Sequence, residues 1–109
     1  MTPRLAVLVR DAATADLAEA AEWYEQRRVG LGVEFLRAAR ALLAGIGRTP
    51  LQFPMVRGQV RRARVRRFPY VVYFIPEPAR VVVVAVLHGR RDPRVWQERA
   101  DAEGQGADA

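Results

Sequence analysis

The stretch YVVYFIPEPARVVVVAVLH, residues 70–88, decides the fold. Its first six residues are rich in β-branched and aromatic side chains, which predicts a strand from Tyr70 to Ile75. The PEPA sequence that follows is typical of a turn. Seven consecutive apolar residues then fill the segment between Arg80 and His88, so this second strand is expected to lie inside a sheet with both faces covered.

Two predicted helices precede these strands. One apolar stripe at helical spacing predicts a helix over about residues 13–28, and a second stripe predicts another over about residues 33–46. The GLG sequence at residues 30–32 separates them, so the two helices are expected to form an αα-hairpin. On the first helix, Glu22 and Glu25 are expected to face solvent and the neighbouring arginines.

Three further segments complete the predicted order. The apolar run Leu5–Val9 predicts a short strand that is buried on both faces. Residues 48–59 hold two prolines and a glycine, which predicts a connecting loop with Phe53 buried as its anchor. Val60–Phe68 predicts a strand that Pro69 interrupts. The order is therefore β-α-α-β-β-β, an α+β fold.

Length and composition limit the possible functions. The 109 residues suffice for one domain, which we place at residues 1–99, and the acidic residues 100–109 are expected to be disordered. The absence of cysteine excludes disulfides and thiolate sites, and neither a cofactor nor a metal site is predicted. The longest apolar run is far shorter than the ~18 residues that span a bilayer. We therefore expect a cytoplasmic protein without a membrane partner.

Charge is unevenly distributed along the chain. All 18 basic residues are arginine, and the net charge is +6. Residues 1–47 hold six arginines and six acids, whereas residues 48–99 hold twelve arginines and three acids, a net charge of +9. A coding bias explains the choice of arginine over lysine but not its concentration in one half. This concentration predicts a surface that meets an anionic partner.

The strand predicted over residues 60–68 carries the densest charge. Because side chains alternate along a strand, Ala63 and Val65 are expected to face the helices, with Arg61 and Arg67 at the ends of that face. The other face would carry a row of cations about 7 Å apart, namely Arg62, Arg64 and Arg66. Such a row suits either a solvated edge strand or a face that binds phosphate or carboxylate. The lack of any acid from residue 35 to residue 76 favours anion binding.

The segment HGRRDPRVW at residues 88–96 holds further candidates. His88 is either a packed residue at a strand end or a general acid or base beside the arginine row. Arg91 and Asp92 are expected to form an ion pair that fixes the turn. Trp96 is expected to cap the core, with stacking on a nucleic-acid base as the alternative.

Three stretches together resemble the RelE/ParE superfamily of toxins from bacterial type II toxin–antitoxin modules. They are AAEWYEQRRVGLGVEFL, VRRARVRRFPYVVYFI and VVVVAVLHGRRDPRVW, and the resemblance covers about residues 13–99. It implies a small antiparallel-rich sheet with the helical hairpin on one face and an open, basic face on the other. It also implies growth inhibition, a role in plasmid stabilization, and a cognate antitoxin that neutralises the toxin in a hetero-oligomer.

The superfamily divides by mechanism. RelE-like members cleave mRNA on the ribosome, and the positions matching their basic residues are Arg62, Arg64 and Arg91. The lysines and the tyrosine of that pattern are missing, which leaves His88 or Tyr73 to carry a proton.

ParE-like members bind and poison DNA gyrase without cleaving anything. The HGRRDP ending and the missing nuclease residues favour this branch, while a general RNA- or DNA-binding module remains the alternative from another class. The residues expected to bind an anionic target or the antitoxin are Arg61, Arg62, Arg64, Arg66, Arg90, Arg91 and Trp96.

Overall fold

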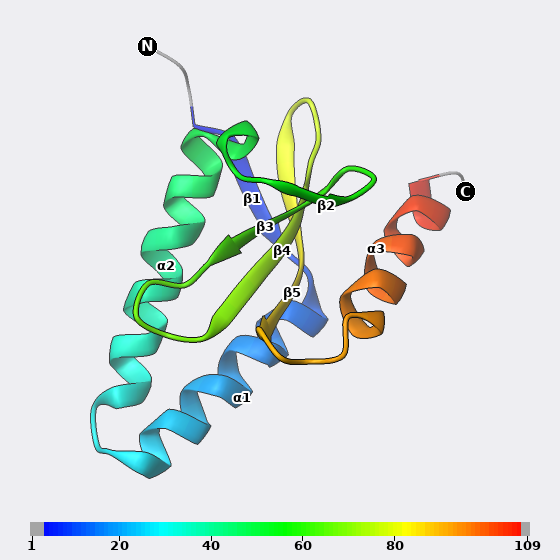
Figure 1. Cartoon of the computed structure of the whole chain (residues 1–109). Coiled ribbons are helices and arrows are strands. Elements are labelled where there is room, and N and C mark those ends of the chain that lie inside the picture. The colour runs from blue at the N-terminus through cyan, green and yellow to red at the C-terminus, as the bar shows by residue number, and fades with distance from the viewer. Residues whose placement is uncertain (1–3, 108–109) are drawn as a thin grey trace.

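The computed structural model describes residues 4–107, with side chains as far as residue 104, and contains a five-stranded sheet (Figure 1). The strand order is β1-β5-β4-β3-β2, in which β1 runs parallel to β5 and all other neighbours are antiparallel. The strands are β1 (Ala6–Val9), β2 (Met55–Arg57), β3 (Val60–Arg64), β4 (Tyr70–Pro76) and β5 (Arg80–His88). The predicted α+β fold with an antiparallel-rich sheet is confirmed.

Strand β5 lies inside the sheet, as predicted. All seven of its apolar residues are buried, because β5 has a neighbour on each side and a core on each face. Strand β1 has β5 as its only neighbour, so its residues are half-buried or exposed. The expectation that β1 is buried on both faces was therefore wrong.

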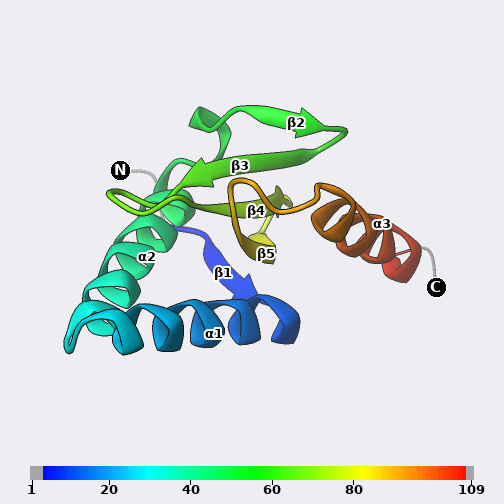
Figure 2. The same ribbon diagram turned by 60° about the horizontal axis from the view of Figure 1, so that its bottom comes forward.

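Helices α1 (Asp11–Arg27) and α2 (Leu31–Arg48) form the predicted hairpin and lie beneath the sheet in Figure 2. Gly30 joins them with a φ of 91°, a left-handed conformation that glycine adopts without steric cost. Gly32 lies where the two helices approach closely, since a Cβ there would be 2.5 Å from the carbonyl oxygen of Ala21. Both glycines of the GLG sequence are thus required by the hairpin.

Glu25 stabilises the turn between α1 and α2. Its carboxylate accepts hydrogen bonds from the backbone N–H groups of Gly30 at 2.9 Å and Gly32 at 3.0 Å. N–H groups at the start of a helix lack helical partners and favour a negative charge. Glu25 therefore caps α2 instead of pairing with a neighbouring arginine as expected, while Arg28 pairs with Glu34 at 3.0 Å.

A cluster of aromatic rings closes the hairpin face of the sheet. Tyr24 of α1 and Phe35 of α2 have ring centroids 5.4 Å apart, and both contact Phe68 and Tyr70 edge to face. Contacts of this kind add about 0.5–1.5 kcal/mol each to the energy of burial. This cluster is the centre of the main core.

Residues 48–59, expected to be a plain loop, contain the 3₁₀ helix η1 (Pro50–Gln52) and the edge strand β2. All three residues of β2 are exposed, so no alternation of apolar and polar residues marks this strand in the sequence. Phe53 packs as predicted, with its ring 5.8 Å from that of Phe74.

Helix α3 (Arg94–Ala107) lies against the sheet face opposite the hairpin and was not predicted (Figure 1). Residues 100–107, expected to be disordered, continue this helix, whereas residues 108–109 lie outside the described residues. Trp96 and Ala100 are buried against the sheet, so this face is partly covered instead of fully open. Within the described residues, no helix is long and apolar enough to cross a membrane.

Candidate functional site

The candidate site includes two exposed arginines of β3. Ala63 is buried in the core on the hairpin side, so Arg62 and Arg64 leave the strand on the opposite face, which also carries α3. Neither arginine forms an ion pair with any other described residue. Arg62 lies beside Tyr73, its partner on β4.

The third predicted cation of the row, Arg66, does not lie on a strand. Strand β3 ends two residues earlier, and the chain turns with a hydrogen bond from the N–H of Phe68 to the carbonyl of Val65 at 3.3 Å. Arg67 adopts a φ of 71°, which is uncommon for any residue except glycine. The predicted strand was too long because the early turn lets Phe68 enter the aromatic core.

The turn places three arginines against α2. Arg64, Arg66 and Arg67 line a shallow hollow of about 300 Å³ whose other walls are Ala38, Ala41 and Leu42. No acid lines this hollow. The single row expected from the sequence is therefore replaced by Arg62 on the sheet and a cluster at the sheet edge.

Arg61 forms hydrogen bonds to the backbone of the preceding segment. Its guanidinium donates hydrogen bonds to the carbonyl oxygens of Phe53 at 2.6 Å and Leu51 at 3.2 Å. These bonds hold η1 and the segment leading to β2 onto the sheet. Arg61 is therefore not the free binding residue that was expected.

Tyr73 and Trp96 form a stacked pair on the α3 side of the sheet. Their ring centroids are 4.8 Å apart with an interplanar angle of 10°, and both side chains are buried. Burial raises the pKa of the Tyr73 phenol above its usual value, so it is a poor base near neutral pH. Trp96 caps this core, as expected, and is not exposed for stacking on a base.

His88 lies at the exposed end of β5, on the other side of the sheet from Arg62. Its ring packs edge to face on Tyr70 with centroids 5.6 Å apart, and its Nδ1 accepts a hydrogen bond from the N–H of Arg90 at 3.0 Å. Together with α1 it lines a hollow on the hairpin face. The expectation that His88 could work beside the arginine row was wrong, because β5 directs it to the opposite face.

The turn after β5 presents Arg90 and Arg91 to solvent. Asp92 does not pair with Arg91 as expected. Its carboxylate accepts hydrogen bonds from the backbone N–H of Arg94 at 2.9 Å and from the guanidinium of Arg94 at 2.7 Å. The side-chain hydrogen bond from Arg94 is the main cause of the lowered pKa of Asp92. Asp92 thus caps the start of α3 and leaves Arg91 uncompensated by it.

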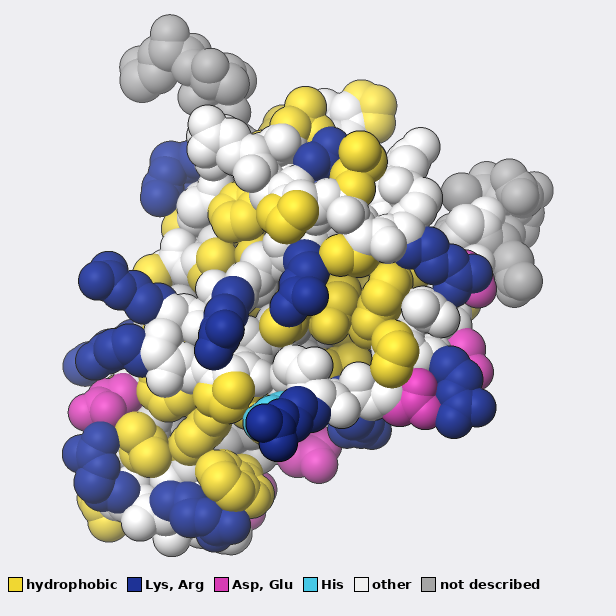
Figure 3. Space-filling model, viewed as in Figure 1, with side chains coloured by type: hydrophobic (Ala, Val, Ile, Leu, Met, Phe, Trp, Pro, Cys, Tyr) yellow, Lys and Arg dark blue, Asp and Glu magenta, His cyan; other side chains and the backbone are white. Residues whose placement is uncertain are grey.

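The arginines spread over the face of the molecule seen in Figure 3. Arginine side chains lie over the middle of the sheet and along the α2 side, while acidic side chains lie mainly beside α3 and the helical hairpin. Among the described residues, no three His, Cys, Asp or Glu side chains lie together as a metal site. The arrangement can bind anions, and the exposed imidazole of His88 lies near Arg91 but not near Arg62 or Arg64.

Comparison with known proteins agrees with this arrangement. The family model of the ParE toxin of the type II toxin–antitoxin system, parDE, matches residues 7–93. The chain belongs to the ParE toxin family. A solved structure titled "Chromosomal ParDE TA system from P. aeruginosa" has the same fold, with a TM-score of 0.70 and 13% identity over 78% of this chain and 96% of that one. No curated protein matches the sequence.

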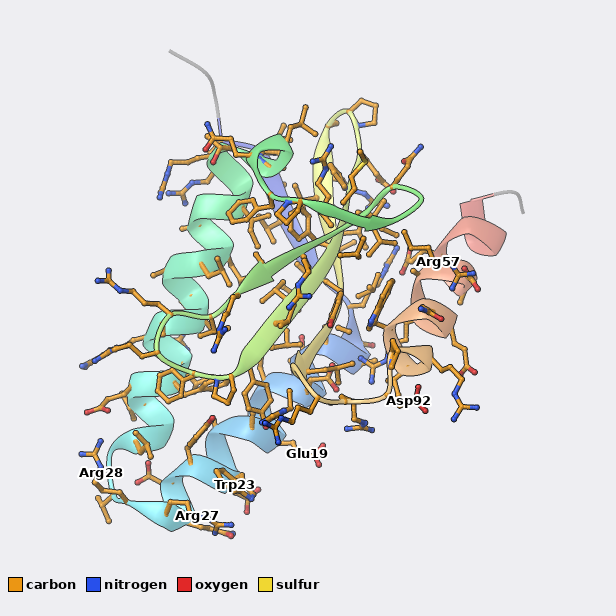
Figure 4. All side chains as sticks on the ribbon, in the orientation of Figure 1. Glu19, Trp23, Arg27, Arg28, Arg57 and Asp92 are labelled. Carbon is orange, nitrogen blue, oxygen red and sulfur yellow. The ribbon has the colours of Figure 1, made fainter. Side chains whose placement is uncertain are left out.

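Helix α3 follows the segment that matches the ParE family model. Three ion pairs join it to the rest of the chain. Glu103 pairs at 2.6 Å with Arg10, which lies between β1 and α1, Arg99 pairs at 2.6 Å with Asp16 of α1, and Asp101 pairs at 3.6 Å with Arg57 of β2. Figure 4 shows Arg57 beside this helix and Asp92 at its start. The segment that matches the ParE family is thus continued by a helix that packs through Trp96 and Ala100 and also forms three ion pairs.

The pair of Asp16 and Arg99 also completes one edge of the sheet. Strand β1 ends opposite Val83, which leaves the next residues of β5 without a neighbouring strand on that side. There the Asp16 carboxylate accepts a hydrogen bond from the N–H of Val86 at 2.9 Å, and Arg99 donates one to the carbonyl of Val84 at 3.2 Å. Two side chains substitute for a missing strand.

No pattern in the sequence indicates these contacts. Arg99 and Asp16 are 83 positions apart, and Arg10 and Glu103 are 93 apart. Each residue taken alone is an ordinary charge on a helix or beside one. Two residues stood where a cap could have been recognised: Glu25, at the helix end just before a GLG turn, and Asp92, just before Pro93.

Proposed function

We propose that this ParE-family toxin arrests growth in the cytoplasm by binding DNA gyrase, and that a cognate antitoxin neutralises it. Family membership and the fold support a toxin. The observation that carries the mechanism is that Arg62 and Arg64 lie on the face of the sheet opposite to His88, the exposed side chain best suited to accept a proton. This separation favours binding over RNA cleavage.

A metal-independent RNA cleavage needs a base within hydrogen-bonding reach of the attacking hydroxyl group. Arg62, Arg64 and Arg91 are permanently protonated and can only stabilise negative charge. Tyr73 is buried under Trp96, and its phenol has a raised pKa. His88 lies on the other face of the sheet. The candidate nuclease residues therefore do not form one reaction centre.

The same arginines suit an anionic protein surface. Arg62, the cluster at the edge of α2, and the Arg90–Arg91 turn are exposed, and each guanidinium offers a planar pair of donors to a carboxylate. An acidic segment of the antitoxin, or an acidic surface of the target, would be drawn to this face by a chain of net charge +6. The similarity to a solved ParDE system supports an antitoxin as partner.

Purified protein and inducible expression test the proposal together. Expression alone should stop growth, co-expression with the adjacent reading frame should restore it, and the protein should inhibit supercoiling by purified gyrase. The double change Arg62→Ala and Arg64→Ala should remove inhibition with nearly unchanged melting. Arg37→Ala with Arg40→Ala, on exposed positions of α2, is the matched control.

Other outcomes would overturn the proposal. Codon-phased cuts in mRNA after induction would establish the RelE-like nuclease. Normal growth, combined with salt-sensitive binding to RNA or DNA, would establish a non-toxic nucleic-acid-binding module.

A further inference from the structure

The three arginines at the edge of α2 differ from the other exposed arginines in how the backbone presents them. Consecutive residues of a strand point to opposite faces of the sheet, so Arg66 and Arg67 would be separated if β3 continued. The turn after β3 instead brings both side chains to the hollow that Arg64 lines. This turn contains the left-handed φ of 71° at Arg67, and strained backbone conformations of this kind cluster at functional sites.

The hollow is strongly positive. Its three arginines form no ion pair with any other described residue, and no acid lines it. The one acid of α2 is Glu34, a helical turn before Ala38, and its carboxylate is paired with Arg28 at 3.0 Å. Three guanidinium groups therefore line one hollow without a counter-charge from the chain, and they attract an anion to it.

The remaining wall of the hollow consists mainly of small side chains. It is formed by Ala38, Ala41 and Leu42, which lie at helical spacing along α2. None of the large exposed apolar side chains lines it, because they lie at the tip of the helical hairpin and on the segment from η1 to β2: Trp23, Val29, Val33, Leu51, Met55 and Val56. Interfaces between proteins depend on large aromatic and apolar anchors, whereas interfaces with nucleic acid are more polar and much more positively charged. The hollow therefore matches a phosphate backbone better than an acidic protein segment.

Arg91 lies in a different setting. It lines another hollow together with the rings of Trp23, Tyr24 and Tyr70. These rings supply the large apolar contacts that the cluster at the edge of α2 lacks. The two groups of arginines therefore suit different partners.

We propose that Arg64, Arg66 and Arg67 bind the phosphate backbone of duplex DNA, so that the toxin contacts gyrase and the DNA held by gyrase together. This inference rests on the proposed function, because DNA is the substrate of the proposed target. Each guanidinium donates paired hydrogen bonds to phosphate oxygens, and the alanines of α2 let the wide sugar-phosphate backbone come close. The contact involves no base edge and therefore reads no sequence. Arg62 and the Arg90–Arg91 turn are left for the protein partners.

Fluorescence anisotropy with a short labelled DNA duplex and the full-length toxin measures this contact directly. The logarithm of the affinity should fall linearly with the logarithm of the salt concentration, with a slope of about −0.9 for each phosphate contacted. Arg66→Ala combined with Arg67→Gly should weaken binding about tenfold and make the slope shallower by about two. Glycine adopts the left-handed conformation of position 67 freely, so this variant keeps the turn while it removes both guanidinium groups.

A matched control removes two positive charges elsewhere, through Arg27→Ala combined with Arg40→Ala. Arg27 lies over the Trp23 ring at 4.0 Å, at the hairpin tip. Arg40 is two residues from both Ala38 and Leu42, so it leaves α2 on another side. The control should lose much less affinity for the duplex, and circular dichroism checks that both variants are folded. Equal weakening by the two variants would show that only overall charge matters and would overturn the inference.

Binding to purified gyrase, with and without DNA, separates this inference from the proposed function. The unmodified toxin should bind gyrase more tightly when DNA is present. The Arg66→Ala, Arg67→Gly variant should lose this gain and bind DNA-free gyrase as the unmodified toxin does. Gyrase binding that is unaffected by DNA, together with no affinity for the duplex, would overturn the inference alone.

Competition identifies the anion that the cluster prefers. Polyglutamate carrying the same total charge should displace the duplex poorly, and RNA should bind no more tightly than the duplex. Efficient displacement by polyglutamate would assign the cluster to an acidic protein, and tighter binding of RNA would assign it to RNA, so either result contradicts the inference. If the toxin does not bind gyrase in either state, the proposed function fails, while the anisotropy measurement still decides whether the cluster binds DNA.

Discussion

The two faces of the sheet are closed in different ways. On the hairpin face, α1 and α2 bury a continuous apolar core around Phe35, which is fully buried. On the other face, α3 buries little more than Trp96 and Ala100 and is joined to its neighbours by ion pairs. The first face is closed by a large apolar core, and the second by a smaller apolar core together with ion pairs.

This difference indicates which face of the sheet tolerates substitutions without loss of the fold. The apolar core of the hairpin face contains side chains of β1, β3, β4 and β5. The α3 face is more polar, and it carries the exposed arginines on which the proposed function depends. Substitutions on each face should therefore differ in their effect on stability.

The largest effect is expected in the aromatic cluster. Phe35→Ala should lower the free energy of unfolding by about 3–5 kcal/mol, because it removes a buried ring and leaves a cavity. Chemical denaturation monitored by circular dichroism measures the loss. Trp23→Ala, on the same hairpin but 48% exposed, should cost far less, and equal losses would contradict the contrast.

The hairpin turn should respond next. Gly32→Ala puts a methyl group 2.5 Å from the backbone oxygen of Ala21, which cannot move without separating the helices. We expect a loss of about 1–3 kcal/mol from overpacking. Gly45→Ala in α2 meets only the end of Arg48 at 3.8 Å and should gain about 0.5–1 kcal/mol from helix propensity. Melting temperatures that shift in the same direction would contradict this assignment.

The pair that joins the two faces should have an intermediate effect. Asp16→Asn removes the charge that compensates Arg99 and weakens the bond to the N–H of Val86. We expect a loss of about 1–2 kcal/mol, as for other partly buried bonds to a charged group. Hydrogen exchange should show the Val86 amide opening faster, while the amide of Val72 in the hairpin-side core is unchanged.

The smallest effect should come from the outer ion pair of α3. Glu103→Gln removes the partner of Arg10, whose pKa is raised mainly by that hydrogen bond. Because Arg10 is well exposed, the loss should be small and should fade in high salt. Thermal melts of both proteins at low and high salt would reveal it, and a loss independent of salt would contradict an electrostatic contact.

The hairpin-side elements were predictable because their signals are local. Seven apolar residues in a row mark β5, and the 3.6-residue stripe marks α1 and α2. Strand β2 is too short and too exposed to leave such a pattern. The turn at Arg67 was not predicted, because no sequence pattern indicates an arginine in the left-handed backbone conformation. This turn places Arg66 away from the predicted row.

Helix α3 and much of the site could not be predicted for a related reason. Residues 94–107 contain only two large apolar side chains, Val95 and Trp96, and the ion pairs of the helix are made with residues 40 or more positions away. The exposed positions of Arg62 and Arg64 followed from simple alternation. The placement of His88 opposite to them depended on the register of β4 and β5, which no single stretch encodes.

The substitution of two side chains for a strand at the edge of β5 has a consequence for how such a protein can evolve. Once α3 supplies Arg99 to the Val84 carbonyl, β1 is free to stay short, and nothing selects for a longer strand. A chain cut back to residue 93, where the family match ends, would then leave that part of β5 open to pairing with other proteins. A helix added at the end of the domain in this way becomes difficult to lose, whatever its first use was.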